Sequence, residues 1–158
     1  MKYYLAYGSN LNVPQMAVRC PGAVPVGVAV IEDYELLYKG SRTGSYLTIE
    51  PAEGCRVPVA VWKVSADHEK ALDAYEGFPS FYYKKDFRLK VRYLSSGREC
   101  MRDCFAYIMD ERRHLGIPSP WYVDVCRQGY RVFDFDPAYL ERAYERSSGG
   151  VWMERRAI

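Results

Sequence analysis

The sequence predicts a single α+β domain in which short strands form a curled or closed sheet with a few flanking helices. The chain has 158 residues, which is close to the usual size of one domain. Hydrophobic residues make up 49% of it and charged residues 27%, a globular composition that excludes general disorder. Short apolar runs are separated by turns rich in Gly, Pro and Asp, which is typical of a sheet that curls on itself. We assign residues 1–150 to this domain and residues 151–158 to a C-terminal tail.

The first half of the chain is expected to consist mostly of strands. Tyr3–Tyr7 is short and aromatic-rich and stops at Gly8. Asn12 is a suitable cap for a short helix that carries Pro14 in its first turn and ends at residues 20–22. Apolar and β-branched runs indicate four further strands, at Val24–Ile31, Glu35–Tyr38, Tyr46–Ile49 and Val57–Val64.

The second half of the chain begins with a helix. Ser65 is a suitable cap for a helix over Asp67–Tyr75, with Glu69 as the acid of a capping box, and Gly77 ends it. The remaining predicted elements are the strands Lys84–Arg92, which alternates basic and apolar residues, and Cys104–Met109, and helices from Pro120 to Gly129 and from Ala138 to Arg146.

Charge and cysteine content limit the class of protein. The net charge of +2 argues against a dedicated nucleic-acid-binding protein. The longest apolar run, residues 23–31, is too short for a membrane span and contains Pro25 and Gly27, and the N-terminus has no signal-peptide pattern. The 5 cysteines are odd in number and irregularly spaced. We therefore expect free thiols, a cytoplasmic location, and neither a metal nor another cofactor.

The segment Tyr7-Gly8-Ser9-Asn10-Leu11 is the most informative part of the sequence. A strand leads into it and a helix begins a few residues later. Such a turn directs several backbone N–H groups into one concavity, which suits a carboxylate or an oxyanion. The alternative is an ordinary strand-to-helix turn in which Ser and Asn cap the backbone.

Glu76 is the second candidate, at the predicted end of a helix and next to Tyr75, with Phe78 two residues further on. The helix dipole is negative at that end, and apolar neighbours disfavour the charged form of a carboxyl group. Both effects raise its pKa towards the value that a general acid–base residue needs near neutral pH. The alternative is a solvent-exposed carboxylate at a frayed helix end.

These features together resemble the gamma-glutamylcyclotransferase and AIG2-like family over most of the chain. Its members begin with a strand and a Tyr-Gly-Ser-Asn-Leu loop, and carry a short helix ending in a Glu-Gly pair, as Glu76 and Gly77 do here. Pro118, Ser119 and Tyr122 match the family's Pro-Ser-x-x-Tyr pattern. The resemblance implies a small mixed β-barrel with a few flanking helices.

The resemblance also implies a cofactor-independent intramolecular acyl transfer. The α-amine of a γ-glutamyl amide would attack its own γ-carbonyl group, giving 5-oxoproline and a free amino acid or amine. Glu76 would act as general base and then as general acid. The implied substrate-binding residues are Tyr7, Gly8, Ser9, Asn10, Leu11, Tyr83 and Tyr122. Tyr82 is the alternative to Tyr83, because a slip of one residue turns a strand side chain to the opposite face.

Several alternatives remain open at the level of sequence. The same barrel could be a non-catalytic module that binds a small molecule, and the leaving amine and the choice between monomer and homodimer are undetermined. The expected partner is a small γ-glutamyl compound, with no nucleic acid and no membrane. Arg19, Lys39 and Arg42 are cations that could attract an acidic substrate.

Overall fold

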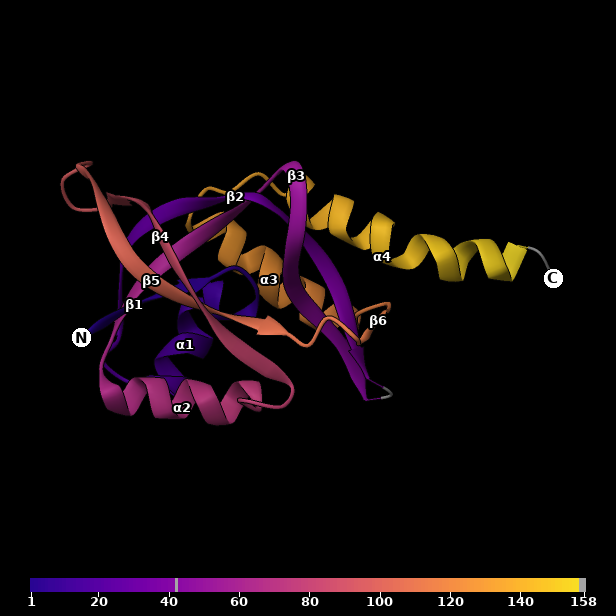
Figure 1. Ribbon diagram of the computed structural model, residues 1–158, viewed down its shortest axis with the longest axis horizontal. Coiled ribbons are helices and arrows are strands. Elements are labelled where there is room, and N and C mark those ends of the chain that lie inside the picture. The colour runs from indigo at the N-terminus through magenta and orange to yellow at the C-terminus, as the bar shows by residue number, and fades with distance from the viewer. Residues whose placement is uncertain (42, 157–158) are drawn as a thin grey trace.

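Two long antiparallel strands form the largest part of the structure, a computed structural model that describes residues 1–41 and 43–156 (Figure 1). These strands, β2 (Val24–Ser41) and β3 (Gly44–Val64), each join two of the shorter strands expected from the sequence. The sequence predicted two strands with a gap near Asp33, but the structure has one strand with a β-bulge there. Asp33 takes a left-handed conformation with φ of 60°, and the pairing shifts between Glu32 and Tyr34. The Asp33 carboxylate accepts a hydrogen bond from the Gly54 N–H at 2.9 Å, so the hairpin bends there without ending.

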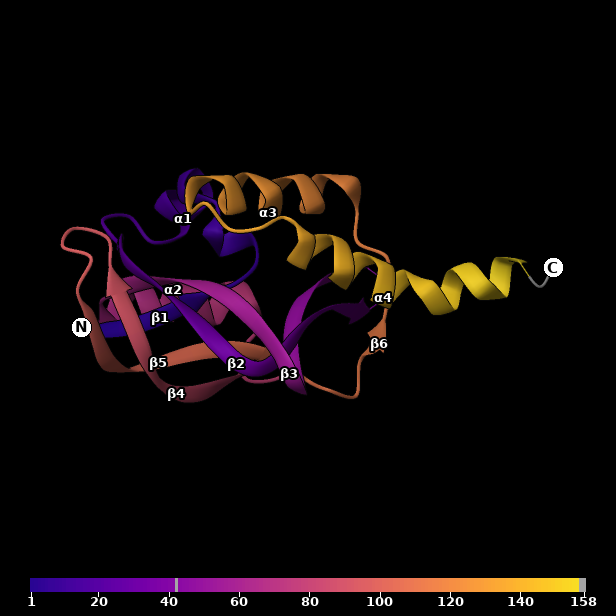
Figure 2. The same ribbon diagram turned by 90° about the horizontal axis from the view of Figure 1, so that it is seen from above.

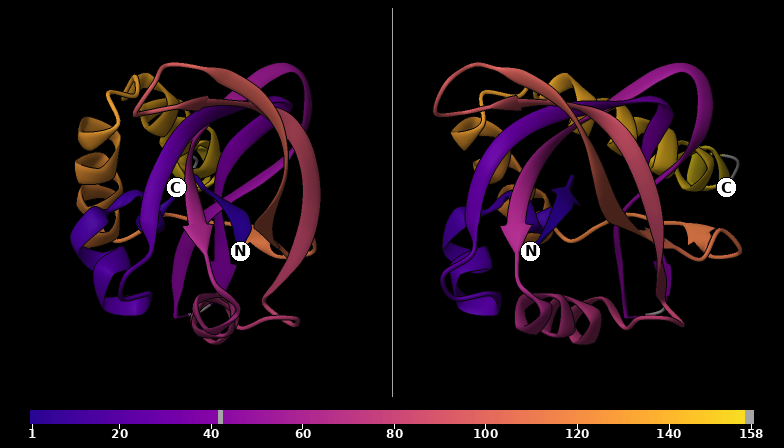
Figure 3. Two further views of the ribbon diagram at one scale, coloured as in Figure 1. Left: turned by 90° about the vertical axis from the view of Figure 1, so that its left-hand side faces the viewer. Right: turned by 60° about the vertical axis from the view of Figure 1, so that its left-hand side comes forward.

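Five strands close into a mixed barrel. The first strand, β1 (Lys2–Ala6), lies between β3, to which it is antiparallel, and β5 (Glu99–Met109), to which it is parallel. β4 (Tyr82–Tyr93) joins β5 to β2, and the β2–β3 pairing completes the ring (Figure 3). The short β6 (His114–Leu115) extends β2 outside the ring. The prediction of a small curled or closed mixed barrel is therefore confirmed, and the barrel is closed.

The first two helices are capped at the predicted residues. In α1 (Val13–Arg19), the Asn12 side chain accepts a hydrogen bond from the Gln15 N–H at 3.2 Å. In α2 (Ala66–Glu76), Ser65 is the cap, but the prediction of Glu69 as its capping-box partner is wrong. His68 takes that role, since its Nδ1 accepts from the Ser65 N–H at 3.1 Å and leaves Glu69 free for contacts with the barrel.

The last two helices are longer than predicted. In α3 (Pro120–Val132), Gly129 lies inside the helix, where it allows close contact with Leu11. In α4 (Ala138–Arg156), the Ser147 hydroxyl accepts from the Tyr38 N–H at 2.8 Å, and the Ser148 hydroxyl donates to the Tyr144 carbonyl at 2.7 Å. One serine hydroxyl thus bonds to β2 and the other to the backbone of α4. Neither serine ends the helix. The helix runs on into the expected tail (Figure 2), whose last two residues lie outside the described residues, as does Arg42.

The loop after β1 is held between helices. It forms the short 3₁₀ helix η1 (Ser9–Leu11), which contacts both α1 and α3, and these two helices lie side by side along the barrel (Figure 2). The largest buried side chains, among them Trp62, Tyr107 and Leu5, fill the core. The 5 cysteines are free thiols. Within the described residues, no helix combines the length and apolar character needed to cross a membrane.

Gly129→Ala is expected to destabilise the protein by about 2 kcal/mol, because overpacking of this size forces the backbone to shift. A Cβ at this position would lie 2.4 Å from the Leu11 Cβ and 2.6 Å from its carbonyl carbon. Urea denaturation measures the change. Gly149→Ala is the matched control, since among the described residues no atom outside the adjacent backbone of its own helix lies within 4 Å of its Cβ position. It should stabilise by about 0.5–1 kcal/mol, as expected for removal of a helical glycine. Equal effects of the two substitutions would contradict the close contact.

Candidate active site

A cavity of about 390 Å³ opens where the loop after β1, the C-terminal end of α2 and the start of β4 meet. Its walls are largely aromatic, and Glu76 carries the one charged side chain among its lining residues. Such a combination of apolar walls with a few polar groups is typical of a small-molecule site. The lining residues are Tyr4, Tyr7, Gly8, Ser9, Asn10, Tyr46, Leu47, Ala74, Tyr75, Glu76, Gly77, Phe81, Tyr82, Tyr107 and Tyr122.

The loop after β1 supplies backbone donors to this cavity. Gly8, Ser9 and Asn10 all line it, and no hydrogen bond inside the described part of the chain uses their N–H groups. The side chains of the loop are tied down, since the Asn10 amide donates to the Tyr4 hydroxyl at 2.9 Å and the Ser9 hydroxyl lies 3.2 Å from that of Tyr75. A loop fixed in this way presents free N–H groups that suit an anionic group.

Leu11, the fifth residue of the motif, is not part of the cavity lining. Its N–H donates to the Gly8 carbonyl at 3.0 Å, which closes the turn, and its side chain is fully buried against Gly129 of α3. The expectation that its N–H binds substrate does not fit this geometry. Leu11 instead anchors the loop to the helix.

Glu76 is the last residue of α2, and Gly77 ends the helix in a left-handed conformation with φ of 64°. The carboxyl group is half-buried in the cavity. Burial raises its pKa to about 7, and the nearby Arg19 guanidinium opposes part of this rise. A carboxyl group with this pKa is partly ionised at neutral pH, so it is suited both to accept and to release a proton.

Arg19 connects the two halves of the site from outside the cavity. Its guanidinium donates to the Asn10 side-chain oxygen at 2.5 Å and to the Tyr75 hydroxyl at 2.7 Å, and it stacks 3.7 Å from the centre of the Tyr75 ring. The loop and the residue before Glu76 are therefore held by one cation. Lys39, the other described cation of the three named from the sequence, pairs with Glu50 and does not line the cavity.

Tyr7 and Tyr122 lie in the cavity wall, as the sequence predicted for both. The Tyr7 hydroxyl donates to the Tyr107 carbonyl at 2.5 Å, and the Tyr122 hydroxyl accepts from the Leu47 N–H at 3.0 Å. Burial raises the pKa of both phenols well above the ordinary value, so they stay neutral.

The placement of Tyr83 in the cavity is wrong, and Tyr82 takes its place. Successive side chains of β4 point to opposite faces, and register puts Tyr82 on the inner face. The Tyr82 hydroxyl donates to the Leu47 carbonyl at 2.8 Å. Tyr83 points outward, where its hydroxyl donates to the Glu111 carboxylate.

Sequence reasoning missed most of the remaining wall. Tyr46 and Tyr107 come from strands far from the loop and the helix in sequence, and no local pattern distinguishes them from the other tyrosines. Tyr75 and Phe81, which the sequence places near Glu76, do line the cavity. Within residues 1–41 and 43–156, no three His, Cys, Asp or Glu side chains gather where they could hold a metal ion.

Comparison with known proteins shows the family of this chain. The family model described as "Gamma-glutamyl cyclotransferase, AIG2-like" matches residues 4–124. The chain belongs to this family. It is 31% identical over 146 residues to a gamma-glutamylcyclotransferase of Homo sapiens, covering 88% of this chain and 75% of that one. A gamma-glutamylcyclotransferase of Bos taurus is 37% identical over 134 residues, covering 80% and 68%.

Solved structures show the same fold. A gamma-glutamyl cyclotransferase with 28% sequence identity superposes with a TM-score of 0.74 over 90% of this chain and 85% of that one. YkqA from Bacillus subtilis, at 19% identity, gives a TM-score of 0.72 over 93% and 54%. This second likeness concerns the fold alone. The barrel described above is thus the gamma-glutamylcyclotransferase-like fold.

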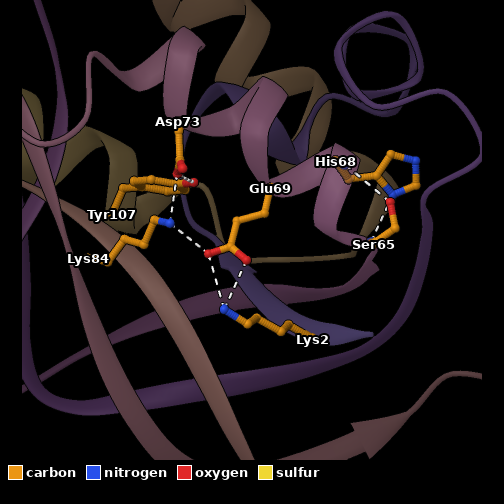
Figure 4. Close-up of polar contacts among 7 residues, drawn as sticks. All are labelled: Lys2, Ser65, His68, Glu69, Asp73, Lys84 and Tyr107. Atoms are coloured by element: carbon orange, nitrogen blue, oxygen red, sulfur yellow. Dashed lines mark hydrogen bonds and ion pairs between the residues drawn. The ribbon is translucent and has the colours of Figure 1, made fainter.

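In this family member, charged residues fasten the Glu76 helix to the barrel (Figure 4). The Lys84 ammonium of β4 lies 2.6 Å from the Glu69 carboxylate and 2.9 Å from that of Asp73. Asp73 also accepts from the Tyr107 hydroxyl at 2.6 Å, and Glu69 pairs with Lys2 of β1 at 2.9 Å.

These contacts lie on the helix face that leads to the cavity. Glu69, Asp73 and Glu76 follow each other at intervals of four and three residues, so they share one face of α2. Burial opposes ionisation of Glu69, but the hydrogen bonds from Lys84 and Lys2 outweigh it and hold the pKa of this carboxyl below its usual value. The ion pairs therefore set where Glu76 lies relative to the barrel.

Lys84→Met is expected to lower the free energy of unfolding by about 1–3 kcal/mol, because it leaves two half-buried carboxylates without their shared partner. Chemical denaturation at pH 7 measures this loss. Lys90→Met is the control, since Lys90 pairs with Glu99 at 3.4 Å on an exposed strand face. It should change stability by less than about 0.5 kcal/mol. A loss as small as that of the control would show that the ion pairs do not hold α2.

Glu76→Gln is expected to stabilise the protein at pH 8 by up to about 3 kcal/mol. The folded-state pKa of about 7 lies above the unfolded value, so the folded state loses stability as pH rises from about 4.5 to 7. The glutamine cannot ionise and escapes this loss. Urea denaturation at pH 5 and pH 8 should show a gain that is small at pH 5 and large at pH 8. A gain independent of pH would mean that Glu76 ionises normally.

Proposed function

We propose that this protein is a gamma-glutamyl cyclotransferase that converts a γ-glutamyl amide into 5-oxoproline and a free amino acid or amine. The observation that carries the proposal is a carboxyl group with a pKa of about 7 in a cavity that also presents unused backbone N–H groups. Family membership supports the same class of reaction.

The reaction needs one residue for proton transfer. The substrate's α-amine nitrogen forms a bond to its own γ-carbonyl carbon, and the bond from that carbon to the leaving nitrogen breaks. The Glu76 carboxylate takes a proton from the attacking nitrogen and later gives it to the leaving nitrogen, so the residue is regenerated. A pKa near the working pH suits both transfers. The substrate supplies its own nucleophile, so the protein does not have to provide one.

Binding and orientation are the other requirement. Backbone N–H groups of Gly8, Ser9 and Asn10 would hold the α-carboxylate or the oxyanion that forms on the γ-carbonyl oxygen. Aromatic walls, among them Tyr7 and Tyr122, would fold the substrate so that its amine meets its carbonyl group. These phenols stay neutral, so they line the cavity without adding charge.

The test is release of 5-oxoproline, followed by mass spectrometry, from a panel of γ-glutamyl amino acids and γ-glutamyl amines. Glu76→Gln should lower kcat by about 10²-fold or more, the usual loss for a general acid–base residue. For the unaltered protein, kcat/KM should fall as pH drops below about 7, because the base becomes protonated.

Asp67→Asn is the matched control, since Asp67 lies exposed at the other end of the same helix. It should leave kcat unchanged. Full activity of the Glu76→Gln protein would overturn the mechanism. Absence of turnover with every substrate would favour the alternative of a non-catalytic module that binds a small molecule in the barrel.

A further inference from the structure

Arg19 of α1 carries a charge that its hydrogen-bond partners do not neutralise. Within the described residues, its guanidinium donates to the side chains of Asn10 at 2.5 Å, Gln15 at 2.6 Å and Tyr75 at 2.7 Å. All three groups are uncharged, so the positive charge remains to act on its surroundings. The carboxyl group that it acts on is that of Glu76, which follows Tyr75 in the chain.

The guanidinium joins two separate walls of the active-site cavity. Asn10 belongs to the loop that lines the cavity with its backbone, and Tyr75 precedes Glu76 at the end of α2. The Arg19 guanidinium also lies 3.7 Å from the centre of the Tyr75 ring, and the hydroxyl groups of Tyr75 and Ser9 lie 3.2 Å apart. A change in the spacing between the loop and the helix end would therefore break at least one of these contacts.

Helix α1 is fastened at both ends, which fixes the base of the arginine. At its start, the Asn12 side-chain amide donates to the Val125 carbonyl at 3.2 Å and to the Gln128 side chain at 3.0 Å, both in α3. Just beyond its end, the Pro21 carbonyl oxygen lies 2.7 Å from the His68 Nε2 of α2. A side chain on such a support keeps its position better than one on a free loop does.

The other titratable groups that face Glu76 in the described residues are phenols, from Tyr75 of its own helix and from four tyrosines on other elements. Burial raises the pKa of each of these four well above its ordinary value, so they stay neutral near pH 7. They do not replace the charge of the arginine. The four are Tyr4 of β1, Tyr7 of the loop, Tyr82 of β4 and Tyr122 of α3.

We propose that Arg19 is a positioning residue of the active site, which holds the loop after β1 and the Glu76 end of α2 at a fixed spacing and acts on Glu76 through its charge. This inference rests on the proposed function. The two contacts use different nitrogens, Nη1 towards Asn10 and Nη2 towards Tyr75. A lysine keeps the charge but lacks this planar fork, so substitution can separate the two roles.

The pH profile of kcat/KM for a γ-glutamyl amino acid tests the charge. The fall in kcat/KM at low pH is expected at about 7 for the unaltered protein. Arg19→Gln should move this fall upward by about one pH unit, because a nearby cation lowers the pKa of a carboxyl group by about that much. Arg19→Lys should leave it in place. Both variants should raise KM by about threefold or more, since neither provides the fork that joins the loop to the helix end.

A second measurement needs no turnover. At pH 8, the gain in stability from Glu76→Gln should be larger in the Arg19→Gln background than in the unaltered protein, because Glu76 then ionises without the nearby cation. A shift of one pH unit corresponds to a difference of up to about 1.4 kcal/mol in urea denaturation. At pH 5 the two backgrounds should give the same gain, since Glu76 is mostly protonated in both.

Arg88→Gln is the matched control, because it removes the same charge from an exposed arginine that pairs with Asp103 at 2.9 Å. It should change neither the pH profile nor the gain from Glu76→Gln.

The inference is wrong if Arg19→Gln leaves the pH profile and the gain from Glu76→Gln unchanged, if Arg19→Lys shifts the profile as far as Arg19→Gln does, or if KM stays unchanged in both variants. Those results would leave the proposed function standing. Absence of 5-oxoproline from the whole substrate panel would overturn the proposed function, and the stability comparison would then decide by itself whether Arg19 acts on Glu76.

Discussion

The Glu76 carboxyl group is held at a helix end and is partly removed from water, and the surrounding structure tolerates this. Desolvation disfavours its charged form, and the walls of neutral tyrosines provide no cation to compensate. Arg19 lies outside the cavity, where its charge lowers the pKa of Glu76 in part. The same guanidinium binds the loop and Tyr75. The same groups thus set both the position and the acidity of the carboxyl group. A group that is unfavourable for folding is kept where proton transfer would need it.

Two elements, α2 and the loop after β1, must keep their positions on the barrel for this arrangement to persist. α2 is fastened through Lys84, which bridges two of its carboxylates, and through the Tyr107 hydroxyl. The loop after β1 is pressed against α3 at Gly129. The contacts of α2 are made with the barrel, and those of the loop are made with α3, which packs along the barrel. The closed barrel therefore fixes the positions of both elements. Residues on such rigid supports hold a catalytic geometry better than residues on free loops do.

Local signals in the sequence indicated a curled or closed sheet, a Gly-Ser-Asn turn with backbone donors, and a carboxylate beside a helix-ending glycine. The small mixed barrel and the role of Glu76 were implied by the resemblance to the family, because several of its motifs occur in the same order. The sequence did not resolve whether Tyr82 or Tyr83 faces inward, since that depends on strand register, which long-range pairing determines. It also missed the length of β2 and β3, where Asp33 and Gly54 look like turn residues but form a bulge. The aromatic wall from Tyr46 and Tyr107 depends on tertiary contacts and has no local signal.

The parallel pairing of β1 with β5 has a consequence for how the protein is made. β1 emerges first from the ribosome, yet one of its two neighbours, β5, begins at Glu99. Contacts so distant in sequence form late, because a long loop must close before they are gained. The β2–β3 hairpin is able to form earlier from adjacent segments, but the ring stays open until β5 pairs with the first strand. A chain interrupted before β5 therefore has an open ring, and it lacks Tyr107 and Tyr122 of the cavity wall.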